Sequence, residues 1–237
     1  MYPDDSIQAL IDPWWVQPNK AGPVAKGDLV WTFVAYPEPE PRILLPQGRT
    51  EDATAHTKAI VRIEVHKIGQ PVPKPSGLPV AGLPLFEGES YFVTRGKIRP
   101  AVVVSTGGID ASQFKARGAP WQTKPAVLVA PYYGVPPDGS RGGWNPELVE
   151  RIQKAEYPQF VWDILPPPSK GGGSILRLDH TFAMGNNPNT HKVTGYRLSD
   201  EAMSILEQWL CWLVTGTPGD ELAYYRAELL KLDELEE

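Results

Sequence analysis

Short apolar strands bounded by proline constrain the fold of this 237-residue chain more than any other feature. One begins at Pro100 and continues through Val102, Val103 and Val104, and another runs over 125–131 and closes at Pro131. The chain has 26 prolines and 22 glycines, and proline occurs at about twice its usual share of ~5%. Proline removes a backbone donor and glycine favours turns. The sequence therefore predicts short strands, many turns and little helix.

Alternating or continuous apolar residues predict several further strands. In the segment 57–67 the residues Ala59, Val61, Ile63 and Val65 alternate with more polar positions, which is the period of a half-buried strand. Proline or glycine flanks most of the other candidates. The predicted strands cover 28–36, 57–67, 90–94, 100–105, 125–131, 159–165 and 174–180.

Three helices are predicted, two of them from their capping residues. Asn145-Pro146-Glu147 supplies an N-cap, a first-position proline and a first-turn acid for a helix that ends near 155. Ser199 and Asp200 begin a helix over 200–215 that is apolar nearly all round, so we expect it to be buried on two sides. A second copy of the chain or the last predicted helix, 220–235, would cover its outer side.

Charge is unevenly distributed along the chain, whose net charge is −5. Residues 220–237 hold seven acidic and two basic residues, and residues 58–124 hold ten basic and four acidic residues. The pattern indicates a basic centre and a separable acidic end that could compete with a polyanion for the basic block. Solvated faces with an acidic terminus would give the same pattern.

Two absences in the sequence bear on location. No apolar run approaches the ~20 residues that span a bilayer, and the N-terminal residues lack a basic start and an apolar signal core. The single cysteine, Cys211, has no partner for an internal disulfide. We therefore expect a cytoplasmic protein without a membrane segment.

Five motifs, in this order, resemble the PemK/MazF family of toxin–antitoxin toxins. They are Gly27-Asp28-Leu29-Val30-Trp31, the strand 95–105 with Arg99-Pro100, the strand 124–131, the strand 174–180 ending Leu178-Asp179-His180, and the helix entry 195–201. The resemblance implies a mainly β fold with helices, namely an SH3-like barrel. In that interpretation 1–24 is an extension, 25–216 is the barrel domain with an insertion at 37–90, and 217–237 is an acidic C-terminal helix.

The resemblance implies metal-independent, sequence-selective cleavage of single-stranded RNA through its own 2′-hydroxyl, a reaction that needs a base, an acid and a cation. Arg99 matches the family's arginine and can grip a phosphate with its guanidinium fork. Tyr133 stands where the family has threonine, and His180 stands where it has glutamine. Alternatively, Arg99 pairs with a carboxylate at a barrel rim, and His180 hydrogen-bonds to a loop carbonyl.

Four further residues are expected to contact RNA: Arg95 and Lys97 as supporting positive charge, and Tyr132 and Trp144 as stacking platforms in loops. No metal or other cofactor is predicted. The expected partners are single-stranded RNA, a small acidic antitoxin protein and a second copy of the chain in a homodimer. Two alternatives remain open, namely a non-catalytic barrel that grips RNA or a protein, and a poison of a protein target such as a topoisomerase.

Overall fold

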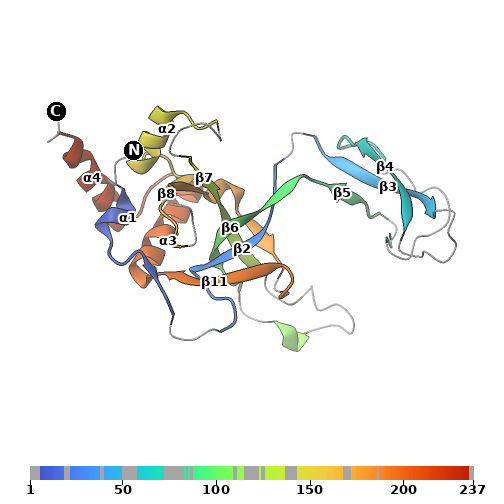
Figure 1. Ribbon diagram of the computed structural model, residues 1–237, viewed down its shortest axis with the longest axis horizontal. Coiled ribbons are helices and arrows are strands. Elements are labelled where there is room, and N and C mark those ends of the chain that lie inside the picture. The colour runs from blue at the N-terminus through green and yellow to red at the C-terminus, as the bar shows by residue number, and fades with distance from the viewer. Residues whose placement is uncertain are drawn as a thin grey trace. The chain divides into compact units, whose positions relative to one another are not determined.

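The computed structural model describes residues 6–18, 22–37, 40–49, 58–71, 83, 85, 88–108, 111–114, 123, 126–136, 143–167, 172–185 and 187–234. The chain forms two compact units (Figure 1). The first combines residues 1–33 with 98–237, and the second comprises 34–97. Within the described residues, no helix combines the length and apolar character needed to cross a membrane.

The first unit is built on a strongly curled, mainly antiparallel sheet, so the fold is mainly β with helices (Figure 1). The strand order is β1-β11-β2-β6-β7-β9-β8, and β10 also pairs with β7. β2 and β6 continue into the second unit. The strands are β1 Trp15–Val16, β2 Asp28–Ala35, β6 Gly96–Ser105, β7 Val127–Gly134, β8 Phe160–Asp163, β9 Ser174–Arg177, β10 Phe182–Met184 and β11 His191–Leu198.

Four α-helices accompany this sheet among the described residues: α1 Ile7–Leu10, α2 Pro146–Gln153, α3 Asp200–Thr215 and α4 Asp220–Glu234. The described residues also form short 3₁₀ helices, η1 Ser112–Phe114 and η3 Leu178–His180. The predicted caps are confirmed. Asn145 accepts a hydrogen bond from the Glu147 amide at 2.9 Å, and the Ser199 hydroxyl accepts one from the Ala202 amide at 3.2 Å.

Alternation along the strands divides the buried side chains between the two faces of the sheet. Val102, Ala130, Tyr132 and Leu176 face the larger core, which α3 completes with Ile205, Leu206 and Trp209. The opposite face holds a smaller cluster around Val103 and Val129. Farther along the sheet, α2 packs with Trp162 and Ile175.

The last helix covers α3 within the same chain. Leu222 and Leu229 of α4 are buried in the larger core. The Gln208 side chain of α3 joins the helices by accepting from the Leu222 amide at 3.0 Å and donating to Glu221 at 2.8 Å. The sequence left open whether a second copy of the chain or the last helix buries the outer side of α3, and in the structure α4 does so.

A polar corner at Gly27 and Asp28 ties three strands together. The Gly27 amide donates to the Val103 carbonyl at 2.7 Å, and its carbonyl accepts from the Leu198 amide at 3.0 Å. Gly27 has a φ of +83°, which glycine adopts without strain. The buried Asp28 carboxylate receives Arg197 Nε at 2.6 Å and the Ala25 amide at 2.8 Å. The Gly-Asp motif is thus part of the scaffold here.

Prolines and glycines explain several differences from the predicted strands. β7 runs three residues beyond Pro131, because the proline lies where the edge of β7 passes from pairing with β10 to pairing with β9. The predicted strand 174–180 ends at Arg177 and becomes η3. β10 and β11 were not predicted; β11 contains Gly195 and has an irregular register with β2 between Val193 and Arg197.

The second unit contains a three-stranded sheet in the order β4-β3-β5, with β3 Arg42–Arg49, β4 Ala59–Val65 and β5 Tyr91–Val93. Sequence reasoning missed β3, because Pro46 and Gly48 interrupt its pattern; its register with β4 shifts between these two residues. Ile43 and Leu45 are buried. The expected insertion, 37–90, lies within this unit.

Candidate functional site

Three residues that the sequence singled out from separate segments lie together on one face of the sheet. Arg99 of β6 places its guanidinium carbon 4.3 Å from the centre of the Tyr133 ring on β7. The Tyr133 hydroxyl is 2.8 Å from Nδ1 of His180, which belongs to η3. The two rings meet edge to face, with centres 5.5 Å apart. Pairing of β6 with β7 and the turn after β9 therefore assemble the cluster.

Neighbouring residues on β9 and η3 hold His180 from its other side. Nη2 of Arg177 is 2.9 Å from Nε2 of His180. The same guanidinium donates to both carboxylate oxygens of Asp179, at 2.7 and 2.6 Å, in a two-point ion pair. Since a guanidinium only donates hydrogen bonds, Nε2 of His180 is the acceptor. Both ring nitrogens of His180 are thus engaged inside the cluster.

The surroundings shift the pKa values of both acid–base groups beside Arg177. Partial burial lowers the pKa of His180, and the positive charge of Arg177 lowers it further. For Asp179, partial burial opposes ionisation, but the hydrogen bonds from Arg177 outweigh it and lower the pKa. At neutral pH the cluster therefore contains a neutral imidazole, a carboxylate and two guanidinium groups, and its net positive charge suits an anionic ligand.

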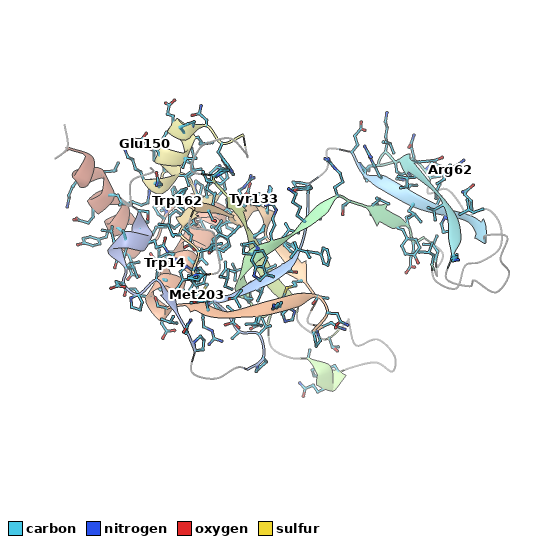
Figure 2. The ribbon with its side chains drawn as sticks, in the orientation of Figure 1. Trp14, Arg62, Tyr133, Glu150, Trp162 and Met203 are labelled. Atoms are coloured by element: carbon cyan, nitrogen blue, oxygen red, sulfur yellow. The ribbon has the colours of Figure 1, made fainter. Side chains whose placement is uncertain are left out.

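Aromatic side chains extend the cluster toward α2. Arg177 also lies over the ring of Phe160, 4.9 Å from its centre. Trp144 meets Phe160 edge to face at 5.9 Å. Figure 2 labels Tyr133 on β7 and Trp162 on β8, which are strands of the same sheet. Trp144 is half-buried and packs against the cluster of Trp162 and Ile175, so the expected stacking of Trp144 on RNA stays a prediction.

Tyr132 requires a correction. It was expected to stack on RNA, but it points to the opposite face from Tyr133 and is only 2% exposed. Its hydroxyl donates to Asp163 at 2.7 Å, and the Trp15 indole donates to the same carboxylate at 3.1 Å. Burial raises the pKa of Asp163 to about 6, although these hydrogen bonds oppose the shift. Tyr132 is therefore a core residue.

The other two predicted RNA contacts lie in the second unit. Arg95 lies 5.9 Å from the centre of the Tyr36 ring, and the Arg95 carbonyl accepts from the Tyr36 amide at 2.7 Å. Lys97 is exposed at the end of that unit. Their expected contact with RNA stays a prediction. Within the described ranges, no group of three or more histidine, cysteine, aspartate or glutamate side chains is arranged to hold a metal ion.

Two of the hollows described in the first unit lie away from this cluster. One, of about 430 Å³, is lined by Trp31, Phe33, Ile98 and Lys192 among others. Another, of about 490 Å³, adjoins the Asp28–Arg197 pair. Neither has Arg99, Tyr133 or His180 among its lining residues.

Sequence reasoning did not single out Arg177 or Asp179 as site residues. The sequence does carry a signal for these two residues. Arg177, Asp179 and His180 lie within four consecutive positions at the end of a predicted strand. The buried Asp163 gave none, since Trp15 lies 148 positions away in sequence.

Comparison of the chain with protein-family models, with curated proteins and with solved structures finds no match.

Proposed function

We propose that this chain is a metal-independent, sequence-selective endoribonuclease of the PemK/MazF type, with an SH3-like barrel as the core of its first unit. The observation that carries the proposal is the convergence of Arg99, Tyr133 and His180 on one face, from three separate segments whose sequences predict this chemistry. The curled antiparallel sheet with added helices is compatible with such a barrel.

The proposed reaction is an internal transfer at one RNA phosphate. The 2′-oxygen attacks phosphorus, the bond from phosphorus to the 5′-oxygen breaks, and the products carry a 2′,3′-cyclic phosphate and a 5′-hydroxyl. Arg99 stabilises the charge that develops on the phosphorane oxygens. Tyr133 gives its proton to the leaving 5′-oxygen.

His180 is the proposed base for the 2′-hydroxyl. Its Nε2 carries a lone pair, which accepts from Arg177 in the absence of RNA. When the Arg177 guanidinium turns to an RNA phosphate, that lone pair becomes available to take the 2′-proton. Arg177 then adds a second cation beside Arg99.

Cleavage of a mixed RNA in EDTA, with mapping of the product ends, tests the proposal. We expect cyclic-phosphate and 5′-hydroxyl ends from the wild-type protein, and a loss of 10²-fold or more in Arg99→Ala. The matched control is Arg62→Ala, because Arg62 of β4 is an exposed arginine paired with Glu64 at 2.6 Å (Figure 2). Full activity in a folded Arg99→Ala protein, or a requirement for metal, would contradict the assignment.

A second candidate is a barrel that binds single-stranded RNA without cutting it. The observation that favours it is the engagement of both His180 ring nitrogens, with Arg177 itself held by Asp179. It predicts salt-sensitive RNA binding that weakens in Arg99→Ala, and intact RNA after prolonged incubation. An acidic antitoxin and a homodimer belong to the first proposal and are tested by sedimentation, alone and with candidate acidic proteins.

A further inference from the structure

The hydrogen-bond chain from Asp179 through Arg177 and His180 to Tyr133 fixes where protons lie in this cluster. Arg177 has no acceptor atom, so its 2.9 Å contact requires an unprotonated Nε2 on His180. A neutral imidazole carries one proton, which must then be on Nδ1. Nδ1–H faces the Tyr133 hydroxyl oxygen at 2.8 Å and donates to it.

This arrangement decides what Tyr133 offers to a ligand. Its oxygen accepts the Nδ1–H bond, so the single hydroxyl proton is directed away from His180. In the other tautomer, Nδ1 would accept a hydrogen bond from the Tyr133 hydroxyl, and the tyrosine would present only lone pairs to a ligand. The tautomer of His180 therefore determines whether the Tyr133 hydroxyl donates to a ligand or only accepts from it. A donor suits an anionic oxygen, and an acceptor repels one.

We propose that Arg177 and Asp179 are positioning residues that lock His180 in the Nδ1–H tautomer, so that Tyr133 presents its hydroxyl proton to an anionic oxygen such as that of a phosphodiester. Asp179 acts through Arg177, whose guanidinium it orients by a two-point contact. The ligand class rests on the proposed function, whereas the tautomer follows from the contacts alone.

The charged groups around His180 also set its response to pH. Arg177 and Asp179 approach it from β9 and η3, Tyr133 from β7, and Arg99 lies across the Tyr133 ring. A proton added to Nε2 would face the Arg177 guanidinium directly. Acidification therefore breaks the Arg177–His180 contact, and because the pKa of His180 is lowered, this requires a more acidic pH than for an ordinary histidine.

Nitrogen-15 NMR of the histidine rings tests the lock without any RNA. In the full chain at pH 7.5, long-range proton–nitrogen correlations assign His180 by its loss in His180→Gln. We expect a protonated Nδ1 and an unprotonated Nε2 in the wild type. Asp179→Asn and Arg177→Met, which removes the donor to Nε2, should each shift His180 toward the Nε2–H tautomer. Arg151→Met on α2, where an exposed arginine is paired with Glu156, should not.

The outcomes separate the two proposals. An Nε2–H tautomer or an imidazolium in the wild type, or an unchanged tautomer in both variants, would overturn the lock. Thermal unfolding checks that each variant is folded, and because Asp179 is only partly buried, we expect Asp179→Asn to retain the fold even if Arg177→Met does not. A correct tautomer in a protein that leaves RNA intact would support the lock while contradicting the nuclease.

Discussion

Replacement of Asp163 by asparagine should give a stability difference between wild type and variant that changes with pH. Asp163 is 1% exposed and its pKa is raised to about 6, against about 3.9 for an unfolded aspartate. The folded state therefore holds the Asp163 proton more tightly, and the free energy of unfolding falls as the pH rises from about 4 to about 6. The two-unit difference corresponds to about 3 kcal/mol, fully lost at pH 7.

Urea unfolding followed by tryptophan fluorescence, at several pH values from 4 to 7, measures this change. The stability of the wild type minus that of Asp163→Asn should fall by about 3 kcal/mol over the range. Asp179→Asn is the matched control, because the pKa of Asp179 is lowered and its contribution changes in the opposite direction. A wild-type minus Asp163→Asn difference that stays constant with pH would refute the reasoning.

Two further predictions concern packing. A Cβ added at Gly173 would overlap the Trp162 ring, so Gly173→Ala should destabilise the protein by at least ~1–3 kcal/mol. Gly134→Ala is the control, because the space around its Cβ is open, and it should cost ~1 kcal/mol or less. Equal denaturation midpoints for the two variants would contradict this prediction. Leu222→Ala should lower the free energy of unfolding by ~2–5 kcal/mol, because Leu222 is fully buried. Leu230 is half exposed on the same helix, so Leu230→Ala should lower it much less. A small effect of Leu222→Ala in calorimetry would mean that α4 is not part of the core.

Local signals in the sequence were sufficient for α2, α3, α4 and several strands, but not for α1, whose segment was not predicted to be helical. The Ser199 cap marks the start of α3, and Gly216 takes a left-handed φ of +81° after its last turn. Two of the strands that were missed contain residues that locally oppose strands, namely Pro46 in β3 and Gly195 in β11. Their pairing partners lie far away in sequence, and a local pattern carries no information about those partners.

The same limit applies to the candidate site. Arg99, Tyr133 and His180 could be proposed from short motifs, because each motif stands at a strand end or a turn. What each one contacts depends on the sheet register, which sets Tyr133 against Ile175 of β9 and brings η3 alongside. The contact between Tyr133 and His180 was therefore outside the reach of sequence reasoning, and so was the burial of Tyr132.

The consecutive tyrosines offer a sharp test of that register, because neighbouring residues of a strand point to opposite faces. Tyr132→Phe removes a donor to the buried Asp163 carboxylate, which should cost ~1.5–3 kcal/mol in stability and raise the pKa of Asp163 further. Cleavage of RNA by Tyr132→Phe should be unchanged, since the phenylalanine ring still fills the core.

Tyr133→Phe should have the opposite profile. The ring remains beneath Arg99 at its 4.3 Å contact, and the half-exposed hydroxyl contributes less than ~1 kcal/mol to folding. Its loss removes the proposed proton donor, so cleavage should fall by ~10²–10⁴-fold while RNA affinity persists. Tyr133→Ala should lose affinity as well, because the ring and its cation contact are gone. Stability and cleavage rates for all three folded variants decide the matter: if Tyr132→Phe impairs cleavage more than Tyr133→Phe, the two tyrosines have been assigned to the wrong faces and the proposed site fails with them.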